Sequence, residues 1–335
     1  MISRRRLFVA LGAVALCAAS LAAEAQQASR VYRIAIVSSG PAAAMAGPVP
    51  TSVSMRALVE ALKARGYVEG QNLILDRWTT YGLDGAGMDG LFADVARAKP
   101  DVIVVPGSGH ALRAVKAASA IPIVMAASGD PVGLGLAQSL AHPGGNVTGL
   151  VTDVGAGAEE KRLEIFLELL PKARRIAFVG QKGDWDFVWG EAVRSAAAKR
   201  KVSITFAEGN PAGFTEALDG IKRKKPDAFF VALSPTTGAF GLKFGQFTLA
   251  NRIPSSCGIA EMAQDGCLMA YGQSAADIFA HSVTYVDKIL KGAKPGDLPI
   301  EQPTRFQLVI NLKTAKALGI KVPQSVLVRA DRVIE

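Results

Sequence analysis

Small polar and acidic residues follow the apolar runs of this chain, and their types suit the binding of a small charged molecule. In sheets of parallel strands, ligands bind beyond the carboxyl ends of the strands, where helix N-termini point backbone N–H groups at them. In the first half of the chain these positions are Ser38, Ser39, Gly107, Ser108, Ser128 and Asp130. In the second half they are Asp184, Trp185, Ser234, Thr236, Thr237 and, within the stretch 257–261, Glu261.

The residue types favour a zwitterion or a small carboxylate as the ligand. The hydroxyls of Ser108 and Ser128, together with free N–H groups, could hold a carboxylate. Asp130 or Asp184 could pair with an ammonium group, and Trp185 could stack on an apolar or aromatic part.

Each of these residues also has a purely structural interpretation. A serine after a strand is often a helix N-cap that contributes about 1 kcal/mol. Asp130 precedes Pro131 and could simply start a turn. Trp185 and Trp189 are four residues apart and could form one helix face packed into a core.

The sequence carries no recognisable catalytic or metal-binding motif. His110, His142 and His281 have no neighbour at metal-ligand spacing, and G-x-S-x-G, H-E-x-x-H and C-x-x-C do not occur. The glycine pairs at 107/109 and 133/135 lack the third glycine of a dinucleotide-binding fingerprint. We therefore expect no enzyme, no cofactor and no metal, with an exported hydrolase as the enzymatic alternative.

Strands that alternate with helices must position these residues. Apolar runs predict strands at 32–37, 102–105 and 121–125, and a further strand that begins at 73–75 and ends near 79–81. Helical spacing predicts helices at 54–65, 91–98 and 110–118. A short helix is also expected over 134–141, ended by Pro143-Gly144-Gly145. This alternation indicates an α/β fold built from parallel βαβ units.

The order of these segments returns in the second half of the chain. Residues 33–37, 99–101 and 121–122 are echoed by residues 175–179, 225–227 and 253–254. Three matches in one order favour two Rossmann-like lobes, which also suits the length of 335 residues. Coincidence of strand starts is the alternative.

Extended segments in corresponding places of the two halves are expected to carry the chain between the lobes. Their hinge residues would be Asn146, Thr148, Gly149, Tyr271 and Gly272. The resulting division has a signal peptide at 1–25, lobe 1 at 31–147, lobe 2 at 148–271 and a return to lobe 1 at 272–300. Residues 301–335 form a last strand and helix that the sequence does not assign to a lobe.

The first residues have the pattern of an export signal. Arg4, Arg5 and Arg6 precede an apolar run over 7–19, and Ala23-Glu24-Ala25 offers a cleavage point. We expect a periplasmic protein exported by a plain secretory signal, with twin-arginine export as the alternative. The formal net charge is +9, but the single basic cluster, 222–225, suits a helix end, so no nucleic-acid partner is expected.

Two cysteines remain after such cleavage, Cys257 and Cys267. In an oxidising compartment they could form a disulfide, if two neighbouring strand ends bring them together. They could equally be two small buried residues.

Four stretches resemble a known family: GDPVGLGLAQSLAHPGGNVTGL, KRLEIFLELLP, YVDKILKGAKPGDLPIEQPTRFQLVINLKTAKALGI and RADRVIE. They are similar to the ABC-transporter substrate-binding proteins related to the tryptophan-binding TrpX group. The resemblance implies the periplasmic binding protein type I architecture, in which two lobes joined by three crossings enclose a ligand cleft. It also implies a monomer that captures a small solute, often an amino acid and sometimes an aromatic one. The solute is then delivered to ABC permease subunits in the inner membrane.

One segment departs from the family pattern. Where such proteins commonly have an asparagine-proline turn, this chain has residues 180–189, GQKGDWDFVW. The sequence therefore does not identify the ligand. It also leaves the alternative that the protein is a sensor module that presents the solute to a receptor.

Overall fold

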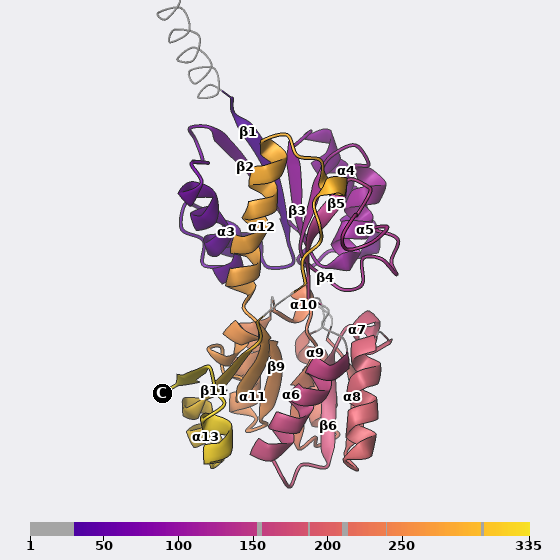
Figure 1. The fold of residues 1–335 in the computed structure, drawn as a ribbon. Coiled ribbons are helices and arrows are strands. Elements are labelled where there is room, and N and C mark those ends of the chain that lie inside the picture. Colours follow the sequence, from indigo (N-terminus) through magenta and orange to yellow (C-terminus); the bar gives the residue numbers. More distant parts are fainter. Residues whose placement is uncertain (1–29, 153–155, 187, 210–213, 239, 303–304) are drawn as a thin grey trace, which may run out of the picture.

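The chain forms two α/β lobes stacked end to end and joined by connecting segments (Figure 1). The computed structural model describes residues 30–152, 156–186, 188–209, 214–238, 240–302 and 305–335. The expected signal peptide at 1–25 lies outside these residues. No helix in the described part of the chain is long and apolar enough to cross a membrane.

The first lobe is built on a five-stranded parallel sheet in the order β2-β1-β3-β4-β5. Its strands are β1 (Tyr32–Ser38), β2 (Leu73–Thr79), β3 (Val102–Pro106), β4 (Ile123–Ser128) and β5 (Val147–Val151). Its helices are α2 (Ala42–Met45), α3 (Val53–Ala64), α4 (Gly85–Arg97), α5 (Ser108–Ala117) and, from far along the chain, α12 (Ala275–Leu290). Helices α3 and α12 cover one face of the sheet, and α4 and α5 cover the other.

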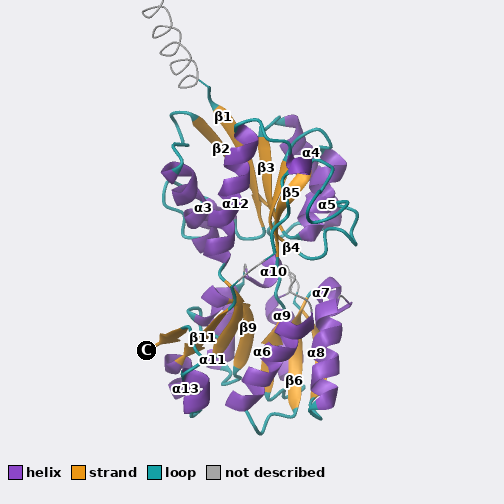
Figure 2. Cartoon of the chain, viewed as in Figure 1, coloured by secondary structure: helices purple, strands orange, loops and turns teal. Residues whose placement is uncertain are grey.

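The second lobe has seven strands in the order β12-β11-β10-β9-β8-β6-β7. They are β6 (Arg175–Gly180), β7 (Ser203–Glu208), β8 (Ala228–Val231), β9 (Ser255–Ile259), β10 (Met269–Gln273), β11 (Gln307–Asn311) and β12 (Arg332–Ile334). All described pairs are parallel except β10 with β11. The α-helices are α6 (Ala156–Leu169), α7 (Lys182–Asp186), α8 (Val188–Lys199), α9 (Phe214–Lys222), α10 (Pro235–Gly238), α11 (Gly241–Ala250), α13 (Leu312–Leu318) and α14 (Gln324–Leu327). Figure 2 shows these helices packed around the strands of the lobe.

The two lobes repeat one topology. The order β7-β6-β8-β9-β10 in the second sheet matches β2-β1-β3-β4-β5 in the first. The repeat extends to single hydrogen bonds: the Asp101 carboxylate accepts from the backbone N–H of Arg33 at 2.8 Å, and Asp227 accepts from that of Arg175 at 2.8 Å. The echo in the sequence therefore reflects two lobes of like topology, as predicted.

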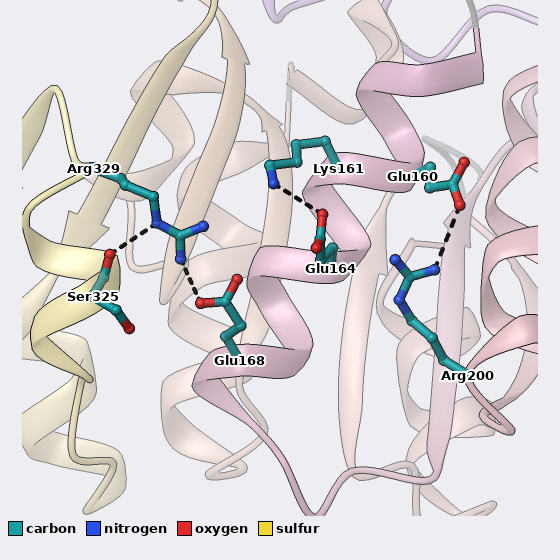
Figure 3. A network of polar contacts seen from close by, with 7 residues as sticks. All are labelled: Glu160, Lys161, Glu164, Glu168, Arg200, Ser325 and Arg329. Atoms are coloured by element: carbon teal, nitrogen blue, oxygen red, sulfur yellow. Dashed lines mark hydrogen bonds and ion pairs between the residues drawn. The ribbon is translucent and has the colours of Figure 1, made fainter.

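Helix α6 lies on the second sheet with a charged outer face (Figure 3). On that face Lys161 pairs with Glu164 at 2.9 Å, and Glu168 pairs with Arg329 near the C-terminus. The opposite face carries buried Leu163 and Phe166 into the core. The helix is thus amphipathic, and the pair of Glu168 with Arg329 links its outer face to the C-terminal segment.

The first crossing begins later than the sequence predicted. Strand β5 is hydrogen-bonded to β4 through Val151, so the predicted lobe boundary after 147 is wrong. Asn146, Thr148 and Gly149 accordingly lie beside or within β5 and not between the lobes. At Gly149 a Cβ atom would lie 2.2 Å from the Met125 carbonyl oxygen, so glycine there permits close strand packing, not hinge motion.

The second predicted hinge also falls inside a strand. Tyr271 and Gly272 belong to β10 of the second sheet, and the chain leaves that sheet after Gln273 to enter α12. A Cβ atom at Gly272 would lie 1.6 Å from the Gly258 carbonyl oxygen, so close packing of the strands explains why this residue is a glycine.

In one further segment the structure differs from the prediction, and in another it settles what the sequence left open. Residues 134–141 form turns and not the expected helix, because glycines and prolines surround them and Gln138 donates to the carbonyl of Pro143 at 2.9 Å. The C-terminal strands β11 and β12 join the second sheet, which assigns the segment that the sequence left open.

The repeated aspartates give a test of the two-lobed repeat. Asp101→Ala and Asp227→Ala each remove the acceptor of a backbone N–H at the start of a central strand. Each should lower the free energy of unfolding by about 1–2 kcal/mol in urea titrations. Asp89→Ala is the control, because Asp89 forms only an exposed pair with Arg113 and should cost under about 1 kcal/mol. Equal losses in all three variants would contradict the repeated role.

Candidate ligand-binding site

The carboxyl ends of strands β1–β5 in the first lobe and of β6–β10 in the second point toward the other lobe (Figure 1). In both sheets the strand order reverses at one point, between β1 and β3 and between β6 and β8. Crevices at such reversals are where open α/β sheets bind ligands. The candidate site is therefore the region where these two edges face each other.

In the first lobe, two serines meet at the start of α5. The hydroxyl oxygens of Ser108 and Ser128 lie 2.8 Å apart, and the Gly129 N–H donates to Ser108 Oγ at 2.8 Å. Gly107 precedes them with a φ of +73°, a conformation that glycine adopts without strain, and α5 begins directly after it. The first N–H groups of α5 have no partner within the helix, so this corner can receive an anionic group.

The end of β1 lies beside that corner. The Ser38 carbonyl accepts from Thr80, whose hydroxyl lies 2.9 Å from His110 Nε2 on α5. Burial, together with the charge of Arg113, lowers the pKa of His110 to about 4, so the ring is neutral at physiological pH. Ser39 Oγ is buried without a hydrogen-bond partner among the described residues. Thr80 and His110 thus fix the start of α5 against β2, a role that the sequence analysis did not assign.

Asp130 does not join these residues. Its side chain is exposed, and its carboxylate accepts from the Gly133 N–H at 2.8 Å. This hydrogen bond closes a turn, as the structural interpretation of Asp130 predicted.

In the second lobe, Asp184 and Ser234 meet at the reversal between β6 and β8. The Asp184 carboxylate accepts from the Gln181 N–H at 2.8 Å and from the Ser234 hydroxyl. Burial raises the pKa of Asp184 to about 6 despite these hydrogen bonds. Thr237 is buried next to them and donates to the Ala232 carbonyl at 2.7 Å. Thr236 lies in α10 between Pro235 and Thr237.

Trp185 and Glu261 are engaged in the framework of the second lobe. The Trp185 ring stacks on Phe206 with centroids 5.4 Å apart, and the Arg194 guanidinium lies over it at 4.4 Å. The Glu261 carboxylate accepts from the Ser274 hydroxyl at 2.7 Å and from the backbone N–H of Ala275 at 3.0 Å, at the start of α12. Glu261 therefore caps the helix that follows the second crossing.

The structure also buries a charged pair that the sequence analysis missed. Glu159 and Arg162 lie on the inner face of α6, with Arg162 Nη2 2.7 Å from Glu159 Oε2. Glu159 and Arg162 share helical spacing with the apolar residues Phe166 and Leu169. This spacing in the sequence could have indicated that both charged residues face the core.

The lobes touch at one edge of the interlobe region. Tyr81, which follows β2, packs against Phe240 with ring centroids 5.9 Å apart, and Lys243 Nζ lies 3.4 Å from its hydroxyl. Tyr81 thus extends from the first lobe onto an apolar cluster of the second.

Cys257 and Cys267 form a disulfide, so the structure selects one of the two alternatives. Both cysteines are fully buried. The bond joins β9 to the residues that lead into β10.

The raised pKa of Asp184 predicts a pH-dependent cost to stability. The carboxyl group binds its proton more tightly when folded, with a pKa near 6 against 3.8 for the ordinary group. The cost is therefore absent below pH 4, grows between pH 4 and 6, and is complete above pH 6. Asp184→Asn should raise the free energy of unfolding at pH 7 by about 1–3 kcal/mol, and the gain should vanish at pH 4. Urea titrations at the two pH values measure this, and Asp186→Asn, on an exposed side chain, should show no such gain.

Comparisons with known proteins agree with this geometry. A tyrosine-binding protein of Clostridioides difficile (strain R20291) is 25% identical over 273 residues, covering 79% of this chain and 76% of the relative. A conserved domain protein of Vibrio cholerae O1 biovar El Tor superposes with a TM-score of 0.77 at 28% identity, covering 91% of this chain and 100% of that one. The ABC domain of Streptococcus pneumonia in complex with L-Trp superposes with a TM-score of 0.76 at 23% identity and the same coverage.

These neighbours confirm the two-lobed α/β fold of type I periplasmic binding proteins. The family model of the ABC transporter substrate binding proteins matches residues 51–334, nearly the whole described chain. The chain therefore belongs to the family of ABC transporter substrate-binding proteins.

Proposed function

We propose that this protein is exported to the periplasm, captures an amino acid or small carboxylate between its lobes, and delivers it to the permease of an ABC importer. The observation that carries the proposal is the corner at α5, where the Ser108 and Ser128 hydroxyls lie 2.8 Å apart at the start of the helix. Such a corner can hold a carboxylate without a charged residue. The signal-like residues 1–25 support export, and membership of the family supports the permease partner.

The opposite lobe offers chemistry for the other end of a zwitterion. Asp184 lies at the reversal between β6 and β8 in the second sheet, where an ammonium group could pair with its carboxylate. A ligand that spans Ser108 and Asp184 would touch both lobes and so favour their closed arrangement.

The relatives support an aromatic amino acid as one candidate. One is named a tyrosine-binding protein, and another was solved with L-Trp. In this chain, however, the rings of Trp185 and Phe206 pack on each other, so any aromatic contact to a ligand has to come from other side chains.

A thermal-shift screen tests the proposal directly. The purified mature protein is screened against amino acids, small aromatic acids and purines. A ligand at 100 times its dissociation constant should raise the free energy of unfolding by about 2.7 kcal/mol. If purines bind and no carboxylate does, the proposed ligand class is contradicted.

Substitution of the α5 corner tests the site. Ser108→Ala and Ser128→Ala each remove a hydroxyl donor and should weaken the ligand found in the screen about tenfold, as isothermal titration calorimetry would show. Ser195→Ala, on the exposed face of α8, is the matched control and should bind normally. Unchanged affinity in both corner variants would remove the carboxylate site from this corner.

The contact at Tyr81 tests lobe closure. If the closed arrangement retains the ligand, Tyr81→Ala should speed its release severalfold and change the association rate little, because affinity differences fall mostly on dissociation. Stopped-flow fluorescence measures both rates. Leu242→Ala removes an exposed apolar side chain beside Lys243 and should leave release unchanged.

A further inference from the structure

Basic residues gather at the end of the second lobe that points away from the first lobe. The carboxyl ends of β6–β10 face the first lobe, so the amino ends of these strands form the opposite end (Figure 1). Four segments that lead into these strands contain eleven lysines and arginines and one acidic residue: 172–175, 199–203, 222–227 and 251–254. We call the surface formed by these four segments the basic end.

Backbone hydrogen bonds hold the four segments side by side. The Ser203 N–H donates to the Arg174 carbonyl at 2.8 Å, and the Asp227 N–H donates to the Arg175 carbonyl at 2.7 Å. The sheet order continues from β8 to β9, which places the fourth segment next to these three. The cluster 222–225, which the sequence alone assigns to a helix end, is therefore part of a larger basic surface.

Few of these charges are neutralised within the chain. Arg175 pairs with Asp227 at 3.0 Å. Lys199 and Arg200 share the carboxylate of Glu160, and Figure 3 shows the contact with Arg200. The other eight cations form no ion pair with any described residue, and all four side chains of the cluster 222–225 are exposed.

Three of the basic residues have a strained backbone conformation. Lys201, Lys225 and Arg252 have φ angles of +57°, +49° and +56°, in the left-handed region that favours glycine. Each residue follows a helix, so its charge interacts favourably with the helix dipole, but for a surface cation this gain is smaller than the strain. Glycine would relieve the strain at all three positions, so cations there indicate a use for the charge.

The composition of the basic end favours a lipid surface over a folded protein as the partner. The centre of a stable protein interface is apolar, but none of the exposed large apolar side chains in the described part of the chain lies in the four segments. A bilayer with anionic headgroups attracts exposed lysines and arginines through charge alone, and each cation adds to the attraction.

We propose that the basic end binds the anionic phospholipid headgroups on the periplasmic face of the inner membrane. This contact keeps the protein close to the membrane in which its permease lies. The inference goes beyond solute capture and rests only on the export that is part of the proposed function. Because the attraction is electrostatic, the contact is reversible and is weakened by salt.

Vesicle sedimentation tests the contact. The mature protein is mixed, without solute, with vesicles of phosphatidylglycerol and phosphatidylcholine or with vesicles of phosphatidylcholine alone. It should sediment with the mixed vesicles at low salt and stay in solution with phosphatidylcholine. In about 1 M NaCl, where the screening length falls to about 3 Å, the affinity for the mixed vesicles should drop about tenfold or more. Absence of binding to the mixed vesicles at low salt would overturn the proposal.

Neutralisation of the cluster locates the contact. The triple variant Lys222→Gln/Lys224→Gln/Lys225→Gln removes three exposed charges that form no ion pair with a described residue. It should bind the mixed vesicles about tenfold or more weakly than the wild type and keep the wild-type melting temperature. Wild-type affinity in this variant would overturn the proposal.

The matched control removes three charges from the first lobe. Lys63, Lys99 and Lys116 are exposed and lie at or just after the ends of α3, α4 and α5, and Lys99 has a φ angle of +50°, as Lys225 has in the second lobe. The variant Lys63→Gln/Lys99→Gln/Lys116→Gln should bind as the wild type does. Equal losses in the two triple variants would show that only the net charge matters and would overturn the assignment to the basic end.

The solute screen and the vesicle assay fail independently. Loss of vesicle binding in a protein that still binds a solute would overturn only the membrane contact. An empty solute screen together with salt-sensitive vesicle binding at the basic end would overturn only the proposed solute capture.

Discussion

The hydrogen bonds of Thr152 join the candidate site to both neighbouring crossings. Its N–H and hydroxyl donate to the Ser128 carbonyl at 2.7 and 3.0 Å, and its own carbonyl accepts from Gln273 Nε2 at 3.4 Å. Ser128 is part of the α5 corner, while Thr152 and Gln273 mark the points where the chain leaves the two sheets. The α5 corner is therefore hydrogen-bonded to the residue at which the chain leaves the first sheet, and through it to the residue at which the chain leaves the second.

The sequence predicted the overall fold because strand periodicity and the internal echo both depend on local residue types. The same reasoning failed at the crossings for a physical reason. A short apolar segment such as 147–151 has the same residue pattern whether it forms a linker or an edge strand. Only its pairing with β4 shows that it is a strand. Gly149 and Gly272 were predicted as hinge residues because they lie in extended segments, but strand packing requires glycine at both positions.

The candidate site could be predicted in part. Ser108 and Ser128 meet at the ends of the neighbouring strands β3 and β4, and Asp184 and Ser234 meet at the reversal between β6 and β8, as strand-end positions should. Glu159 and Arg162 were missed because charged residues on a helix usually indicate a solvated face, and only the tertiary fold shows which face is buried. Burial of the ionised Asp184 carboxylate also costs the protein stability at neutral pH.

Neither lobe is made from one continuous stretch of chain. Helix α12 covers the first sheet from residues 275–290, and β11 and β12 extend the second sheet from the last thirty residues. A polypeptide that emerges from the ribosome N-terminus first cannot complete either core until the later segments have arrived. The nascent protein should therefore expose apolar helix and sheet faces until synthesis is nearly finished.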